Sequence, residues 1–343
     1  VPSFDGLDSF AGDAFHSSRW RHDVALEGRR VSVVGSAASA IQLVPAIADS
    51  VAGLNVLQRS PNWIVPKNDR EYTRAERWLA RRVPPVAWLY RLQVWLWGEC
   101  MAYPALGRNR FAKWEGRRRH RRYLQRVVED PALRAALVPD YPFGAKRVLL
   151  SDNYYQALVK PNVRLVTAPI ARLTPDGIEL AGGEVLDSDV IVFATGFRTT
   201  EFMAPMRVYG RGGLALEERW RDGAEAYLGV MTSGFPNFFM LYGPNTNLGH
   251  NSIVIMHECQ SRLIVDCLRR MHRRGAGRME VRAPVETRYN RRLADRLAHK
   301  AWASIASSWY QDRGRQTNNW PGTTLEYWWR TRRCSDSDYV FSA

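Results

Sequence analysis

A turn of small residues near the start of the chain could bind a phosphate group. It follows the β-branched run Arg30–Val34 and contains Gly35, Ser36, Ala37, Ser39 and Ala40, after which the pattern becomes helical. Free backbone N–H groups and the dipole at a helix amino terminus favour a pyrophosphate. Gly35 supplies the tight turn, and Ala37 replaces the glycine that often comes second. The turn predicts either a dinucleotide site or a strand-to-helix turn without a ligand.

Arg59 and Ser60 follow the next predicted strand, at a place where proteins that bind NAD usually carry an acidic residue. An arginine there can pair with the 2′-phosphate of NADPH, and a serine can donate a hydrogen bond to it. We therefore expect selectivity for NADPH over NADH. The alternative is a surface arginine that closes a strand.

A βαβ unit must position these groups. We predict strands over 30–34 and 54–58, with a helix over 38–48 between them. A segment rich in Trp and Arg, at about 70–140, has helical character and indicates an insertion. Further strands are expected at 163–166, 189–194 and 238–242, and an amphipathic helix over 252–274. These elements indicate the α/β class.

Composition excludes several classes of protein. With 343 residues, 45% of them hydrophobic, the chain can form a sizeable core. No apolar run reaches transmembrane length and the chain opens without signal-peptide features, so we expect a cytoplasmic protein. Its four cysteines form no CxxC pair, which predicts neither a metal site nor a disulfide framework.

The formal net charge of +15 favours anionic partners, and much of it lies over 108–126. One interpretation of this segment is a patch for nucleic acid or anionic lipid. We favour the solvated face of an Arg-rich helix, because arginine replaces lysine throughout the chain. No nucleic-acid partner is therefore expected.

Phe10, Gly12, His16 and Trp20 have the spacing FxGxxxHxxxW directly before the βαβ unit. Through this fingerprint the chain resembles the Baeyer–Villiger monooxygenases, although Arg21 stands where that family usually has Pro or Asp. The resemblance implies that the segment lies between two nucleotide-binding domains and couples their movement, with His16 in a structural or relay role. The alternative is a histidine that is merely part of a linker.

Three further segments extend the resemblance. Pro142–Arg147 resembles the family segment with the active-site arginine, which implies that Arg147 is catalytic and that Lys146 lies near the 2′-phosphate. The residues Ala194, Thr195 and Gly196 resemble the ATG motif that closes the NADPH domain. Asn245 and Asn247 belong to a segment that resembles a loop near the flavin.

The resemblance implies an α/β flavoprotein with two dinucleotide-binding domains. Residues 1–28 would be the connector between domains, 29–225 a Rossmann-like NADPH domain with the helical insertion, and 226–343 the carboxy-terminal part of the FAD domain with a tail. The family's amino-terminal GxGxxG has no counterpart before Phe10. We therefore expect the chain to lack that segment and to hold FAD poorly.

The implied activity is that of an oxidoreductase. NADPH would reduce FAD, O₂ would add to give a flavin peroxide, and the peroxide would attack a ketone to yield an ester or lactone, with Arg147 stabilising the negative charge. One alternative is a flavin monooxygenase that oxidises nitrogen or sulfur, against which Trp20 counts. Another is a non-catalytic nucleotide-binding remnant, favoured by Ala37 and the missing FAD motif.

Overall fold

The computed structural model describes residues 3–197, 199, 201–305, 311–312 and 314–343, which form two compact units. The first unit combines Val1–Glu71, Trp114–Tyr141 and Lys146–Phe197. The second combines Tyr72–Lys113, Pro142–Ala145 and Arg198–Ala343. The helical segment expected at about 70–140 is thus divided between the units, and residues 198–225 belong with the carboxy-terminal part.

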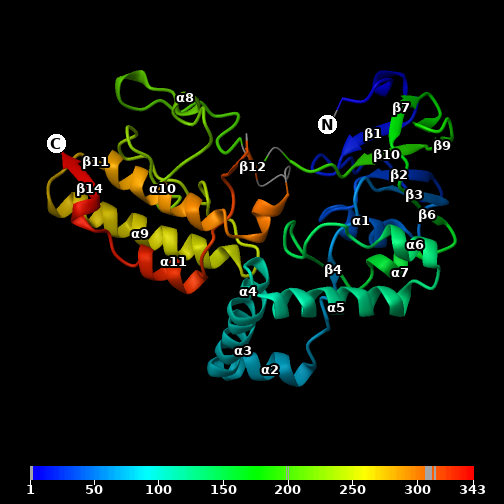
Figure 1. Ribbon diagram of the computed structural model, residues 1–343, viewed down its shortest axis with the longest axis horizontal. Coiled ribbons are helices and arrows are strands. Elements are labelled where there is room, and N and C mark those ends of the chain that lie inside the picture. The colour runs from blue at the N-terminus through cyan, green and yellow to red at the C-terminus, as the bar shows by residue number, and fades with distance from the viewer. Residues whose placement is uncertain (1–2, 198, 200, 306–310, 313) are drawn as a thin grey trace. The chain divides into compact units, whose positions relative to one another are not determined.

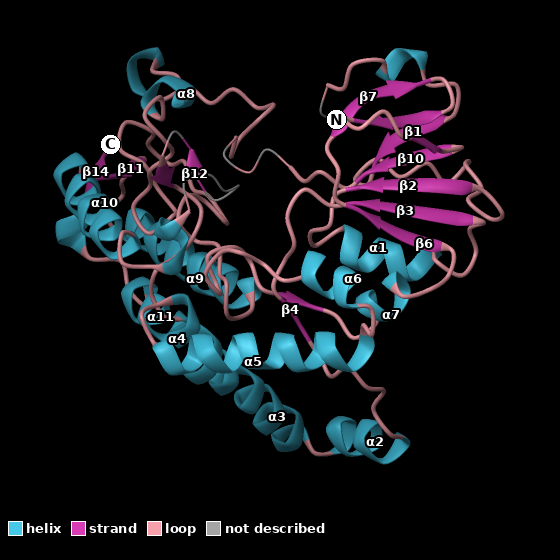
Figure 2. Cartoon of the chain, turned by 45° about the vertical axis from the view of Figure 1, so that its right-hand side comes forward, coloured by secondary structure: helices cyan, strands magenta, loops and turns pink. Residues whose placement is uncertain are grey.

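A five-stranded parallel sheet forms the centre of the first unit (Figures 1 and 2). Its spatial order is β1 (Asp13–His16), β10 (Val190–Phe193), β2 (Arg30–Val34), β3 (Gly53–Leu57) and β6 (Val163–Val166). The crossover from β2 to β3 is helix α1 (Ala40–Ile47), which a parallel pair requires. The βαβ unit and the strands predicted at 163–166 and 189–194 are confirmed.

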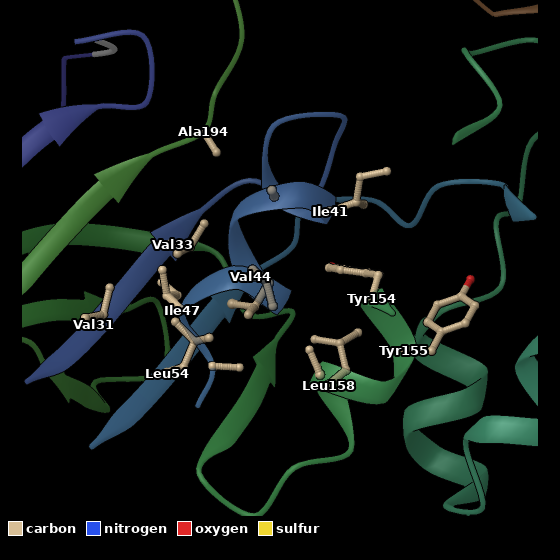
Figure 3. Packing of buried hydrophobic residues seen from close by; sticks show 14 of the residues in the cluster. Val31, Val33, Ile41, Val44, Ile47, Leu54, Tyr154, Tyr155, Leu158 and Ala194 are labelled. Atoms are coloured by element: carbon tan, nitrogen blue, oxygen red, sulfur yellow. The ribbon is translucent and has the colours of Figure 1, made fainter. Parts of the chain in front are cut away.

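Side chains of the sheet alternate between two apolar cores. On one face, Val31 and Val33 of β2 pack with Val44 and Ile47 of α1 (Figure 3). Val34 points to the opposite core. Apolar side chains on both faces are required of a parallel sheet that is covered on both sides. This packing fixes where β2 ends and α1 begins.

A three-stranded antiparallel sheet covers the second face. Its strands are β7 (Ile170–Thr174), β8 (Gly177–Leu180) and β9 (Val185–Asp187). Ile178 and Leu186 of this sheet pack with Ile191 and Phe193 of β10. The other elements of the unit are η1 (Leu7–Ser9), β4 (Ile64–Val65), β5 (Leu149–Leu150), α6 (Pro131–Ala136), α7 (Tyr154–Leu158) and most of α5 (Arg110–Val127).

The segment expected to be a connector, residues 1–28, contributes a strand to the sheet. Asp13–His16 pairs in parallel with β10 from Asp13↔Val190 to His16↔Phe193. The Arg-rich segment forms helix α5, which buries His120, Tyr123 and Leu124 while its arginines Arg121 and Arg122 are exposed.

The second unit is mainly helical. Helices α9 (Ile253–Arg273) and α11 (Thr324–Thr331) bury Met256, Cys259 and Tyr327 in a shared core. The other elements are α2 (Arg74–Arg82), α3 (Pro84–Trp97), the π-helix η2 (Gly98–Ala102), α4 (Tyr103–Leu106), η3 (Arg211–Gly213), α8 (Leu216–Arg219), β11 (Arg278–Val281), α10 (Ala283–Leu297), η4 (Ala301–Ser304), β12 (Gln311–Asp312), β13 (Arg315–Gln316), η5 (Asp336–Asp338) and β14 (Tyr339–Ser342). Among the described residues, no helix is long and apolar enough to cross a membrane.

The structure confirms one expectation for this unit and corrects another. Helix α9 begins after Ser252, whose hydroxyl accepts from Val254 N, and Gly275 follows its end with φ +61°. The strand expected at 238–242 is wrong. Asn237 and Tyr242 have left-handed backbones, with φ of 58° and 60°, so the extended run is interrupted at both ends.

Candidate functional site

The carboxyl ends of four adjacent strands bring most of the predicted residues to one edge of the first unit's sheet. His16 ends β1, Gly35 follows β2, and Ala194 follows β10. Arg59 comes two residues after β3. Because these strands are parallel, their carboxyl ends share one edge, which is where doubly wound α/β folds bind ligands.

Gly35 shapes the turn between β2 and α1. Its φ is +118°, and a Cβ at this position would lie 2.5 Å from the carbonyl oxygen of Ala194. Only glycine fits there without strain. Ala37 is exposed and has no left-handed backbone, so its methyl group is accommodated in the turn.

Helix α1 presents free donors toward this turn. Within the described part of the chain, the backbone N–H groups of Ala38, Ser39 and Ala40 donate to no protein acceptor. Such groups at a helix amino terminus attract an anion. Ser36 is buried and its hydroxyl donates to the carbonyl of Ser60 at 3.2 Å, which ties the turn to the segment after β3.

Arg59, Ser60 and Lys146 form a cationic site at that segment. Lys146 Nζ donates to Ser60 Oγ at 3.3 Å and lies 4.3 Å from the ring centre of Tyr141. Burial and the positive charge of Arg59 lower the pKa of Lys146. Arg59 is exposed, and no described residue accepts a hydrogen bond from it. An anion bound here would relieve the repulsion between the two cations.

Arg147, the next residue after Lys146, is a second exposed cation of this unit. Its guanidinium forms no hydrogen bond or ion pair with any residue that the structure describes. Thr195 and Gly196 of the ATG segment are also exposed, whereas Ala194 is buried. Arg147 is therefore available to an anionic ligand or to developing negative charge.

Both ring nitrogens of His16 form hydrogen bonds, one within its own segment and one to the segment that follows β10. Nδ1 accepts from the backbone N–H of Ser18 at 3.1 Å, so the proton lies on Nε2. Nε2 then donates to the carbonyl of Gly196, 3.0 Å away. The ring is buried, and it fixes the chain where it leaves β10.

The other residues of the fingerprint pack β1 onto the sheet. A Cβ on Gly12 would lie 2.4 Å from the carbonyl oxygen of Asp189. Phe10 is buried in the core shared with β7–β9, and Trp20 meets Phe15 edge to face at 5.2 Å between ring centres. The role of this segment in coupling two domains stays a prediction.

Asn245 and Asn247 lie in the second unit and hold the segment 316–320. Asn245 Nδ2 donates to the carbonyl of Gln316 at 2.8 Å, and Asn247 Nδ2 donates to Asn319 Oδ1 at 2.6 Å. Both asparagines are buried. Their contact with a flavin stays a prediction.

Sequence reasoning missed three residues of the site in the first unit. Asn62 Nδ2 donates to the carbonyl of Ser36 at 3.0 Å, Tyr141 faces Lys146, and Ser18 sets the orientation of His16. Asn62 and Ser18 lie within three residues of predicted positions and could have been considered. Tyr141 lies far from Arg59 in the sequence, so no local pattern could indicate it.

Comparison with known proteins first defines the class. No family model matches the chain. Its structure resembles a steroid monooxygenase bound to NADP, with a TM-score of 0.87 and 29% identity over 99% of this chain and 72% of that one. It also resembles the complex of OTEMO with FAD and NADP, with a TM-score of 0.85 and 26% identity over 100% of this chain and 73% of that one. The fold is that of an α/β flavin-dependent monooxygenase.

Sequence comparison then finds similar proteins with a more specific name. The chain is 41% identical to a Baeyer–Villiger monooxygenase of Pseudomonas aeruginosa, over 98% of this chain and 64% of that protein. It is 40% identical to a Baeyer–Villiger monooxygenase of Streptomyces coelicolor, over 99% of this chain and 66% of that protein. The chain is thus similar to Baeyer–Villiger monooxygenases along nearly its whole length, and it spans just under two thirds of these relatives' length.

Proposed function

We propose that the full-length protein is an NADPH- and FAD-dependent monooxygenase that inserts one oxygen atom of O₂ into a ketone, giving an ester or a lactone. Two relatives that cover nearly the whole chain carry the name Baeyer–Villiger monooxygenase. The observation that carries the proposal is the exposed, unpaired guanidinium of Arg147, which directly follows Lys146 of the cationic site in the sequence.

The first unit fits NADPH. The free N–H groups at the start of α1 suit the pyrophosphate, and Arg59, Ser60 and Lys146 suit the 2′-phosphate. Ser36 connects the two places through its hydrogen bond to Ser60. We therefore assign both phosphate contacts to this edge of the sheet.

The second unit offers polar groups that fit part of FAD. Gln316 Oε1, Thr317 Oγ1 and Asn319 Nδ2 are buried and have no hydrogen-bond partner among the described residues. Buried polar atoms normally find a partner, so these three are suited to a polar ligand. Asn245 and Asn247 would position this segment. When bound and reduced by NADPH, FAD supplies the activation of O₂.

In this proposal, Arg147 stabilises the negative charge that develops during the reaction. As oxygen adds to the ketone, negative charge develops on the carbonyl oxygen, and a fixed guanidinium stabilises that charge best when water is scarce. No nucleophilic side chain is required for this role. Because Arg147 forms no hydrogen bond or ion pair with a described residue, its removal should leave the folded state unchanged.

The experiment measures product ester, hydrogen peroxide and NADPH consumption by the full-length gene product. Arg147→Ala should retain NADPH oxidation but lose ester by about a hundredfold, since one such contact contributes on the order of 3 kcal/mol. Electrons should appear as hydrogen peroxide instead. Arg147→Lys should recover only part of the ester yield, because an ammonium lacks the planar donor fork.

Arg122→Ala is the matched control, because Arg122 is also exposed and unpaired among the described residues of this unit. Ester formation at near wild-type yield by Arg147→Ala would show that another group stabilises the charge. Oxygenation of amines or sulfides without any ester from a ketone panel would instead assign the protein to the N- and S-oxygenating class.

A further inference from the structure

A cavity of about 330 Å³ opens along helix α10 within the second unit. Its volume lies at the lower end of the range for small-molecule sites, which begins near 300 Å³. Its lining is rich in arginine and aromatic residues, and it includes Tyr227, Arg288, Tyr289, Arg292, Trp320 and Asp338.

The charges of the cavity are unbalanced. Four arginines line it, including Arg296 and Arg330, against the single carboxylate of Asp338. Arg296 and Arg330 both bind Glu326, at 2.7 and 2.8 Å. Arg288 and Arg292 form no hydrogen bond or ion pair with a described residue. Two guanidinium groups therefore remain for a ligand.

Helix geometry places these two arginines together. Arg288 and Arg292 are four residues apart on α10, so they lie on one face with Cβ atoms about 5–6 Å apart. The carboxylate of Asp338, which is the negative charge in the lining, already accepts a hydrogen bond from the Tyr227 hydroxyl at 2.8 Å. Two guanidinium forks at this spacing suit a phosphate, whose free oxygens can be shared between them, better than a carboxylate with two oxygens.

Aromatic rings form another part of the lining. Tyr227 and Tyr289 meet edge to face, with ring centres 5.2 Å apart. Trp320 is almost fully buried at 1% exposure and lies beneath the guanidinium of Arg296. Such rings favour a planar apolar group, because stacking and burial of its faces are both favourable.

We propose that this cavity binds a phosphorylated aromatic molecule of about the size of a mononucleotide. The phosphate would pair with Arg288 and Arg292, and the planar ring would lie against Tyr289, which is partly exposed. All lining residues belong to the second unit, so the site differs from the NADPH site of the first unit. The proposal does not depend on the oxygenation chemistry.

Titration calorimetry of the full-length protein with AMP tests this site. AMP should bind, and Arg288→Ala or Arg292→Ala should each weaken it by about tenfold, the usual effect of a lost charge-assisted contact. Arg291→Ala is the matched control, because Arg291 is an exposed arginine of α10 outside the lining. Equal weakening by the control would overturn the assignment, since only bulk charge would then matter.

Three further measurements separate the parts of the proposal. Arg59→Ala should leave AMP affinity unchanged. If AMP affinity falls only in that variant, AMP binds at the proposed NADPH site and the assignment of AMP to the cavity is refuted. Adenosine and inorganic phosphate should each bind at least tenfold more weakly than AMP; phosphate binding as tightly as AMP would overturn the aromatic part. Asp338→Asn should tighten AMP severalfold, because it removes the only carboxylate of the lining.

Discussion

Replacing Arg59 with alanine should separate the two nicotinamide cofactors. In the proposed site the 2′-phosphate of NADPH lies between Arg59 and Lys146, which already repel each other across Ser60. Removal of Arg59 takes away one of two cations, and Lys146 retains its contact with Ser60. We expect NADPH binding to weaken and NADH binding to change by less than about twofold, because NADH has no phosphate there.

The magnitude follows from the exposure of the two cations. Charge-assisted contacts each contribute about 1.5–3 kcal/mol, which corresponds to about ten- to a hundredfold in affinity. Arg59 is exposed and screened by salt, so we take the lower limit, about tenfold. Lys146 is half-buried, so Lys146→Ala should cost more than Arg59→Ala. The difference between the variants should grow as ionic strength rises, because salt screens exposed Arg59 more than half-buried Lys146.

Fluorescence titration of the nicotinamide provides the dissociation constants for NADPH and NADH. Arg122→Ala serves as the control for a change of one charge on an exposed surface of the same unit. The 2′-phosphate assignment is refuted if Arg59→Ala weakens both cofactors equally, or if the control produces the same selective loss. In either case the free N–H groups of α1 could still bind a pyrophosphate, but selectivity would come from elsewhere.

Three other predictions concern pH and stability. NADPH affinity should fall as pH rises toward the lowered pKa of Lys146, because the ammonium group loses its charge. In Arg59→Ala the fall should occur at higher pH, because the charge of Arg59 no longer lowers the pKa of Lys146. Titration of both proteins with NADPH from about pH 7 to 10 tests the shift. Gly35→Ala should destabilise the protein by about 1–3 kcal/mol from backbone strain alone, in addition to the clash with Ala194, and an unchanged thermal midpoint would contradict this. His16→Ala should cost about 0.5–1.5 kcal/mol in denaturant unfolding, because the part-buried hydrogen bond to the Gly196 carbonyl is lost, whereas Ser17→Ala should have little effect.

The sheet could be predicted because its signals are local. Runs such as Arg30–Val34 are short, β-branched and buried on both faces, and the structure forms each of them as a strand. The error at 238–242 has the same origin, since an apolar run alone cannot show that Asn237 and Tyr242 adopt left-handed backbones. The division of the helical segment between two units depends on contacts distant in sequence, so no local periodicity could predict it.

The site could be predicted only in part. Gly35 and Arg59 follow strands that the sequence identifies, and parallel pairing then brings them to one edge. The role of Lys146 is implied only by the resemblance to a family segment. Its contact with Ser60 joins residues 86 positions apart in the sequence, which no local pattern predicts. The sequence does not indicate the cavity at α10, because a regular spacing of arginines is typical of any solvated helix, and Tyr227 reaches this helix only through the fold.

The position of His16 argues for a structural role rather than a proton relay. A relay needs a ring nitrogen that can exchange its proton with a ligand, but Nδ1 is occupied by Ser18 and Nε2 by the carbonyl of Gly196. The buried ring instead holds the segment after β10 from the side of β1, while Gly35 closes against Ala194 from the side of β2. Since β10 lies between β1 and β2, both neighbours fix the same exit at the nucleotide edge. In the proposed NADPH site, the fingerprint residue would therefore act on the shape of this edge rather than on a proton.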